Sequence, residues 1–352
     1  MANEIEEKKY MNQIFFTPIL FLVFNRPENT RIVFNEIKKI KPSKLYIAAD
    51  GPRQDNENDK INCQEVRRII DASIDWDCEV KKLYRDENLG CKKAVSSAIT
   101  WFFENEEKGI ILEDDCLPDE SFFWFCSKLL EKYKYNEQIM MISGMNYLID
   151  EKINIKESYF FSKYFPIWGW ATWKRAWSLY DINMKDWDEL KYYKYFKNIY
   201  RNERMAIYLK TMFQETYDNK IDTWDVQWVF TCLKNDGLSI IPKYNLISNI
   251  GITGTHFNTE TNVQNLLVKS LDVNNIIDPN SIIINNKYNK LFYNQILDLQ
   301  FGKITLKDKL KKIVILLRKI IKIILKKLLF YLNKFMSIFN IEIIIIKKDR
   351  KH

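Results

Sequence analysis

Short apolar runs alternate with amphipathic segments through the first third of the chain. Each run is long enough for one strand, and each amphipathic segment repeats its apolar side chains at the spacing of a helix face. The predicted strands are 18–24, 44–50, 79–85 and 109–115, and the predicted helices are 29–39, 62–72 and 91–105. Units of this length predict an α/β fold, with a mostly parallel sheet covered by helices on both faces.

The part that follows, up to residue 302, is rich in aromatic residues and less regular. Helical patterns occur at 120–133, 192–219 and 225–235. No repeat or low-complexity linker separates this part from the first one. We therefore predict one continuous unit over residues 1–302.

A basic tail begins after residue 302. Residues 303–352 contain 15 of the 54 Lys and Arg residues and 3 of the 46 acidic residues, so the tail carries +12 and residues 1–302 carry −4. The total charge of +8 comes from the tail, and we predict no nucleic-acid partner. Residues 310–328 place Leu, Ile and Val on one helix face and Lys and Arg on the other, which predicts a helix lying on an anionic membrane surface. The alternative is a helix packed back on the domain.

Composition narrows the class of protein. With 352 residues, 47% hydrophobic and 28% charged, the chain is neither disordered nor a small disulfide scaffold. The first 16 residues mix charges without the apolar segment of a signal peptide. No uncharged apolar stretch reaches the about 18 residues that a spanning helix needs. We expect a cytoplasmic protein that is peripheral at the inner face of the plasma membrane.

Polar side chains follow each of the first four predicted strands. Parallel α/β sheets bind ligands beyond the carboxyl ends of their strands, where these side chains gather. A surface loop would also be polar, so each position alone is ambiguous, but four successive strands favour a site. The polar residues in question are Arg26, Asp50, Arg85, Asn88, Glu113, Asp114 and Asp115.

The run of three acids, Glu113 to Asp115, carries the most specific chemistry. Carboxylates directly after a buried strand suit Mn²⁺ or Mg²⁺, and such ions are commonly shared with substrate phosphates. The alternative is a solvated turn or the start of the following helix. The chain has neither a G-x-G-x-x-G nor a G-x-x-x-x-G-K loop, so phosphate would have to be neutralised by metal and Arg.

Six motifs in sequence order resemble a known family. TPILFLVFNRP, AADGP, YRDENLG, IILEDDCLPDE, FPIWGWATWKRAW and DTWDVQW look like the nucleotide-diphospho-sugar transferase domain of GT-A (Rossmann-like) glycosyltransferases. The sequence is most similar to the branch that holds N-acetylglucosaminyltransferase I and bacterial enzymes of surface-polysaccharide synthesis, and the resemblance covers about residues 15–260. It implies a nucleotide-binding half at about 15–115 and an acceptor half at about 116–302. One departure is Asn25, where the eukaryotic branch has Asp.

The resemblance also implies roles for the residues at the strand ends. Asp115 would bind the metal, and Glu113 and Asp114 would face the ribose and sugar of the donor. Arg26 would contact the nucleotide or its phosphates, since Arg forms bidentate bonds to phosphate. Asp50 would meet the base or ribose, and both Arg26 and Asp50 are expected at solvent-open strand ends. Arg85 and Asn88 belong to the same predicted nucleotide-sugar site.

The second half contains the predicted acceptor site and catalytic base. Asp225 resembles the base of inverting members of the family, with Asp222 in reserve, although either carboxylate would also suit a helix cap. His256 is a second predicted metal ligand, or a structural loop residue. The predicted acceptor contacts are Trp168, Gly169 and Trp224. Of the four tryptophans at 168–177, the spacing favours a core position for at least two.

The sequence thus predicts an inverting, metal-dependent glycosyltransferase. The donor would be a nucleotide-diphosphate sugar, with UDP favoured, and the acceptor a saccharide, with a lipid-linked surface glycan favoured. Two alternatives remain open: a non-catalytic nucleotide-sugar or glycan-binding protein, and a membrane-active protein that acts through its tail.

Overall fold

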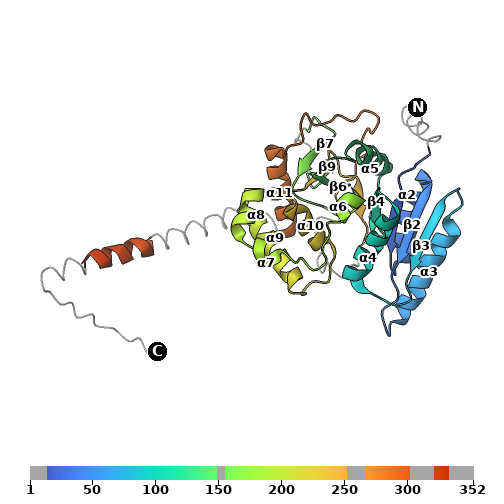
Figure 1. Ribbon diagram of the computed structural model, residues 1–352, viewed down its shortest axis with the longest axis horizontal. Coiled ribbons are helices and arrows are strands. Elements are labelled where there is room, and N and C mark those ends of the chain that lie inside the picture. The colour runs from blue at the N-terminus through green and yellow to red at the C-terminus, as the bar shows by residue number, and fades with distance from the viewer. Residues whose placement is uncertain (1–13, 149–154, 252–265, 302–320, 333–352) are drawn as a thin grey trace. The chain divides into compact units, whose positions relative to one another are not determined.

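The computed structural model describes residues 14–148, 155–251, 266–301 and 321–332. Its contacts divide the chain into two compact units, Met1–Gln300 and Phe301–His352. The first unit is built around an eight-stranded sheet (Figure 1).

The sheet is mixed but mostly parallel. Its strand order is β3-β2-β1-β4-β8-β6-β9-β7. Strands β3, β2, β1 and β4 are parallel to one another. Strand β8 is antiparallel to both β4 and β6, and β9 is parallel to β6. Strand β7 forms the edge and is antiparallel to β9. The strands are β1 (Ile19–Val23), β2 (Lys44–Ala49), β3 (Glu79–Tyr84), β4 (Lys108–Glu113), β6 (Ile139–Ser143), β7 (Tyr159–Ser162), β8 (Trp170–Trp173) and β9 (Leu238–Pro242). A second, two-stranded sheet pairs β5 (Cys116–Pro118) with β10 (Ile247–Asn249).

Helices cover both faces of the main sheet, as the alternation of the sequence predicts. In β1 and β2, Phe21 pairs with Ile47, whereas Leu20 pairs with Tyr46, so Phe21 and Tyr46 point to opposite faces. Phe21 packs on Phe34 of α2 (Pro27–Ile40) and Tyr46 packs on Phe102 of α4 (Gly90–Asn105), with ring centroids 6.0 and 4.9 Å apart. The predicted fold class, an α/β fold with a mostly parallel sheet, is confirmed.

The helices begin and end where capping residues allow, and these boundaries differ from those predicted by the spacing of apolar residues. The helix predicted at 62–72 begins earlier, because the side chain of Asn56 accepts a hydrogen bond from the backbone N–H of Asp59. The helix predicted at 192–219 is two helices, broken where Arg201 adopts φ 47° and Asn202 caps the next one. The helices are α2 (Pro27–Ile40), α3 (Glu57–Ser73), α4 (Gly90–Asn105), α5 (Glu120–Lys132), α6 (Lys174–Trp177), α7 (Trp187–Leu190), α8 (Tyr193–Tyr200), α9 (Glu203–Tyr217), α10 (Asp225–Lys234) and α11 (Asn286–Phe301).

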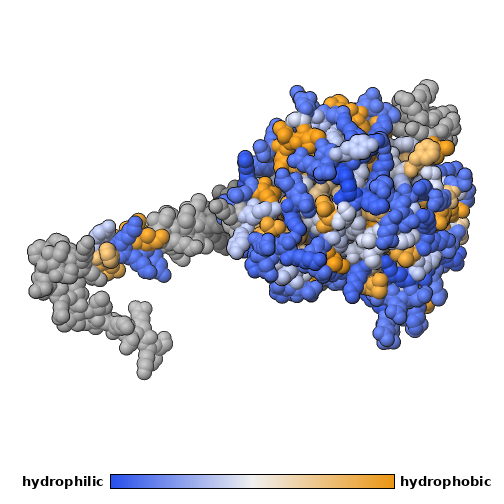
Figure 2. Space-filling view, viewed as in Figure 1, coloured by the Kyte–Doolittle hydropathy of each residue, from blue (hydrophilic) through white to orange (hydrophobic). Residues whose placement is uncertain are grey.

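In the second unit, residues 321–332 form a helix in which every residue is exposed. Ile, Leu, Phe and Tyr side chains there are each more than half exposed, and Figure 2 colours this stretch in both orange and blue. Lys322, Lys326 and Lys327 lie among them. Within the described ranges, no helix is long and apolar enough to cross a membrane. Of the predicted amphipathic face from Leu310 to Leu328, the part up to residue 320 lies outside the described residues.

Candidate functional site

The three acids Glu113 to Asp115, which end β4 and follow it, lie at the carboxyl end of the central parallel strands. Asp114 is buried, and its carboxylate accepts hydrogen bonds from the backbone N–H of Phe24 (3.2 Å) and from Nη1 of Arg26 (3.0 Å). The same nitrogen of Arg26 lies 2.9 Å from Oδ2 of Asp115. Burial lowers the pKa of Arg26, but the attraction of Asp114 and Asp115 outweighs it, so the net shift is upward. Arg26 is therefore a firmly charged bridge between two carboxylates.

Negative charge exceeds positive charge around this bridge. Burial raises the pKa of Glu113 well above its usual value, and Asp115, Asp114 and Asp225 raise it further, against the opposing effect of Arg26. Burial also raises the pKa of Asp114, despite the bond to Arg26. Carboxylates whose pKa values rise in this way are stabilised by an added cation.

The side-chain oxygen atoms at and near Asp115 are of the kind that a hard divalent cation binds. A Cβ added to Gly251 would lie 2.6 Å from Oδ2 of Asp115 and 3.2 Å from Oδ1 of Asn249, so this glycine lets two oxygen ligands approach one spot. Among the described residues no three His, Cys, Asp or Glu side chains group closely enough to hold an ion, so substrate or water oxygens would complete the shell. His256 lies outside the described residues. Sequence reasoning missed Asn249 and Gly251, because they lie at the end of β10 and just after it, and not at one of the first four strands.

Asp225 lies within electrostatic reach of Glu113, although 112 positions separate the two residues. It begins α10, and its carboxylate accepts a hydrogen bond from the hydroxyl of Thr223. Burial raises the pKa of the Cys91 thiol, and four carboxylates raise it further. These belong to Glu113, Asp225, Asp222 and Asp115, so all four act electrostatically on the same thiol. The cap residue of α10 is Trp224, without a side-chain hydrogen bond, so neither Asp222 nor Asp225 caps this helix.

Several tyrosines lie within electrostatic reach of Asp225. The pKa values of Tyr180 and Tyr208 are raised by burial first and then by the charge of Asp225, and the same charge also acts on Tyr147 and Tyr164. The hydroxyl of Tyr180 donates to the carbonyl of Trp224, one residue before Asp225 (3.1 Å). None of these tyrosines was a predicted site residue, and the sequence indicated them only through the many aromatic residues of the second half.

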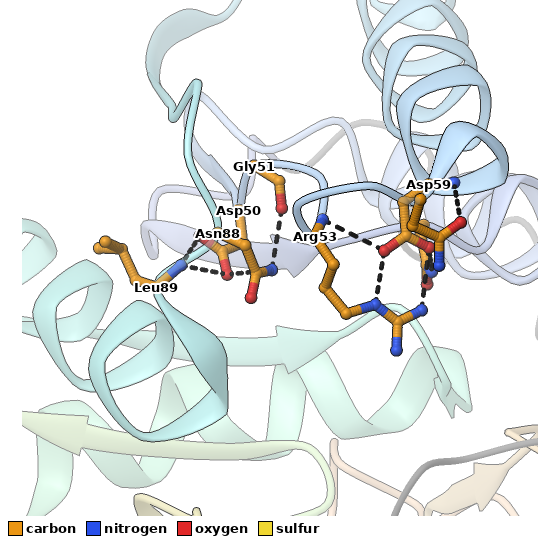
Figure 3. A network of polar contacts seen from close by, with 8 residues as sticks. Asp50, Gly51, Arg53, Asp59, Asn88 and Leu89 are labelled. Carbon is orange, nitrogen blue, oxygen red and sulfur yellow. Dashed lines mark hydrogen bonds and ion pairs between the residues drawn. The ribbon is translucent and has the colours of Figure 1, made fainter.

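Asp50 and Asn88 are turned toward each other and not toward solvent (Figure 3). Asp50 is 8% exposed, and it accepts hydrogen bonds from Nδ2 of Asn88 (3.0 Å) and from the backbone N–H of Leu89 (3.1 Å). The prediction of a solvent-open Asp50 is therefore wrong, since the loop before α4 covers it. Arg85, half-buried in the same region, donates to the hydroxyl of Ser97 (2.8 Å).

Asp59 holds Asn25, the residue before Arg26, and Figure 3 shows its contacts with Arg53. Its carboxylate, 2% exposed, accepts hydrogen bonds from Nη2 of Arg53 (2.9 Å) and from Nδ2 of Asn25 (2.7 Å). Hydrogen bonds from Arg53 lower the pKa of Asp59 to about 2, against the opposing effect of burial and with help from Asn25. Asp59 is at the start of α3 and was not a predicted site residue.

Asp59→Asn should destabilise the protein, by about 1.5–3 kcal/mol at neutral pH, because it removes a buried charge-assisted hydrogen-bond network. A carboxylate with a lowered folded-state pKa stabilises the fold above its unfolded pKa, and this contribution is lost as the pH falls toward about 2. Urea unfolding at pH 7 and at lower pH values would measure the effect. The exposed Asp55→Asn is the control, and equal stability of Asp59→Asn and wild type at pH 7 would contradict the assignment.

The predicted acceptor residues are mostly core residues. Trp224 is 2% exposed and stacks on Trp170 with ring centroids 5.6 Å apart, so it is not available to stack on a sugar. Gly169 is buried with φ 57°, and a Cβ there would lie 2.4 Å from the Ile247 side chain. Trp170, Trp173 and Trp177 are also buried, which confirms the core positions predicted for at least two of the four tryptophans. Trp168 alone of the predicted acceptor residues is partly exposed.

Comparisons with known proteins give distant structural similarities. No protein-family model and no curated protein matches the sequence. A UDP-glucose pyrophosphorylase complexed with UDP-glucose matches with 11% identity and a TM-score of 0.28, over 47% of this chain and 79% of that one. The inositol-1-phosphate CTP transferase from T. maritima matches with 11% identity and a TM-score of 0.29, over 50% and 83%. Mouse xyloside xylosyltransferase 1 in its apo form matches with 9% identity and a TM-score of 0.29, over 62% and 81%. At such TM-scores these similarities carry no argument about function, which has to come from the site itself.

Proposed function

We propose that this chain is an inverting, metal-dependent GT-A glycosyltransferase that moves a sugar from a nucleotide-diphosphate donor to a saccharide acceptor. One observation carries the proposal. Glu113, which begins the run of three acids at the end of β4, lies within electrostatic reach of Asp225, a separate carboxylate at the start of α10. A glycosyl transfer of this kind needs one carboxylate to hold the metal that activates the donor and a second, neighbouring carboxylate to remove the proton of the acceptor.

The donor would bind at the carboxyl ends of the parallel strands β1, β2 and β4. Arg26, a charged side chain with 28% exposure, would contact the diphosphate. Asp115 would hold Mn²⁺ or Mg²⁺, with Asn249 at its side, and such an ion neutralises charge on the diphosphate. Asp114 supports this arrangement from within, because both of its carboxylate oxygens already bond to Phe24 and Arg26.

The chemical step would be one direct displacement. As the bond between the anomeric carbon and the diphosphate breaks, the acceptor hydroxyl oxygen bonds to that carbon from the opposite face. Its proton passes to the Asp225 carboxylate. A base beside the acceptor and no covalent intermediate imply inversion at the anomeric carbon.

The experiment that tests this function is product formation from a panel of nucleotide sugars, UDP-sugars first. Each is incubated with the full chain and simple saccharide acceptors, with and without Mn²⁺. We expect one donor to be consumed in a Mn²⁺-dependent manner and its sugar to appear on an acceptor with inverted configuration. Donor binding without turnover would favour the non-catalytic alternative, and a product of retained configuration would contradict the mechanism.

The tail supports a further part of the proposal, an acceptor carried by a membrane. A lipid-linked glycan at the inner face of the plasma membrane would bring the acceptor to an enzyme that binds the same surface. The helix at 321–332 exposes large apolar side chains together with three lysines, which suits the boundary between head groups and acyl chains.

Removal of residues 303–352 should abolish binding to vesicles that contain anionic lipid, because it removes a charge of +12 and the exposed apolar helix. Binding of the full chain should weaken as salt is raised, since the lysines act through screened charges. Vesicle co-sedimentation measures both effects, with neutral vesicles as the control. Equal binding of the full chain and of residues 1–302 would contradict this role of the tail.

A further inference from the structure

Arg26 contacts the carboxylate of Asp115, the predicted metal ligand. One nitrogen of its guanidinium, Nη1, is 3.0 Å from Oδ1 of Asp114 and 2.9 Å from Oδ2 of Asp115. This Oδ2 also lies closest to Gly251, where a Cβ would be 2.6 Å from it and 3.2 Å from Oδ1 of Asn249. The guanidinium therefore binds one of the two oxygens through which Asp115 would hold a metal ion.

A guanidinium and a divalent cation cannot share this oxygen at close range. Both are positive, and the partly buried setting screens their repulsion poorly. A nucleotide diphosphate changes this balance, because its oxygens offer Arg26 a planar bidentate partner in place of Asp115. The donor would thus draw Arg26 away from Asp115 and release the oxygen that the cation needs.

The surroundings allow the side chain to move while the backbone stays in place. Asn25, the preceding residue, is held by Asp59, and Pro27 begins α2 directly afterwards. Asp114 also accepts a hydrogen bond from the Phe24 backbone N–H, through the oxygen that Arg26 does not contact. Arg26 itself is 28% exposed, so solvent-side space for another rotamer exists.

We propose that Arg26 is a positioning residue that closes the cation site in the ligand-free protein and opens it by moving to the diphosphate of the donor. This inference rests on the proposed function and deepens it, since it sets an order of binding. The cation enters with or after the nucleotide, and the free protein binds it weakly.

The test is Mn²⁺ binding by the full chain, measured from the electron paramagnetic resonance signal of free Mn²⁺, with and without UDP. Wild type should bind Mn²⁺ weakly alone and at least about tenfold more tightly with UDP, the effect of releasing one charge-assisted contact. Arg26→Met should bind Mn²⁺ about tenfold more tightly than wild type when UDP is absent, and UDP should add little. A merely structural role for Arg26 would lower affinity instead.

The control is Arg31→Met, which removes a positive charge one turn along α2, where Arg31 is exposed and pairs only loosely with Glu28 and Glu65. It should bind Mn²⁺ as wild type does. Arg26→Lys, a charged variant, should restore weak Mn²⁺ binding in the absence of UDP and guards against a folding defect in Arg26→Met. Mn²⁺ affinity in Arg26→Met equal to or below that of wild type, while wild type binds Mn²⁺ with UDP, would overturn this inference alone. Absence of Mn²⁺ binding in every protein, with or without UDP, would overturn both this inference and the metal dependence in the proposed function.

Discussion

Asp225→Asn is expected to lower turnover by about 10²- to 10⁴-fold, the range typical of a lost general base. The amide has nearly the shape of the carboxylate but does not accept the proton of the acceptor hydroxyl. Donor affinity should stay near that of wild type, because Asp225 lies beside the donor acids and is not predicted to bind the donor. The fall should therefore appear in kcat and not in the KM for the donor.

Single-turnover kinetics and donor titration on the same preparation measure the two effects separately. Asp222→Asn is the matched control, because Asp222 lies three residues earlier and is exposed. Its turnover should fall far less. If Asp222→Asn is the more damaged variant, the base is Asp222, and if both turn over normally, the proposed mechanism is wrong.

Asp115→Ala is expected to reduce turnover to the background level and to remove the Mn²⁺ dependence of donor binding. The lost carboxylate is the one that faces Gly251 and Asn249, so the protein loses its principal predicted ligand for the cation. Binding and turnover should fall together, since the ion neutralises the diphosphate both before and during the reaction. This joint loss distinguishes Asp115 from Asp225.

Isothermal titration with UDP, with and without Mn²⁺, and a product assay measure the two losses. Asp86→Ala, at an exposed position in the loop after β3, is the control for removing an acid from the same sheet edge. Asp115→Ala with intact Mn²⁺-dependent donor binding would place the cation elsewhere and contradict the assignment of this residue.

The first four strands and the helices between them were predictable because their pattern is local. A strand buried on both faces must be apolar throughout, and β1 and most of β4 are buried. The break between α8 and α9 was not predicted, because one residue with φ 47° interrupts an otherwise continuous helical pattern. The early start of α3 depends on the Asn56 cap, which has no apolar period to mark it.

The site was predictable in its residue types but not in their orientation. Sequence placed three acids after one strand, and alternation does not say which of them faces inward. The structure turns Asp114 to Phe24 and Arg26 and leaves Asp115 beside Gly251. Trp224 and Asp225 are adjacent in the chain, yet one is in the core and the other faces the acids.

The α/β alternation, the candidate acids and the separation of a mildly acidic unit from a basic tail could be predicted from the chain, because each depends on period, residue type or local charge. The loop before α4 over Asp50, the bridge of Arg26 between two carboxylates and the electrostatic reach of Asp225 to Glu113 are visible only in the folded chain. These contacts join segments between 38 and 112 positions apart. They exist because sheet order and helix packing bring those segments to one edge, and no local pattern in a single chain specifies which distant side chains meet there.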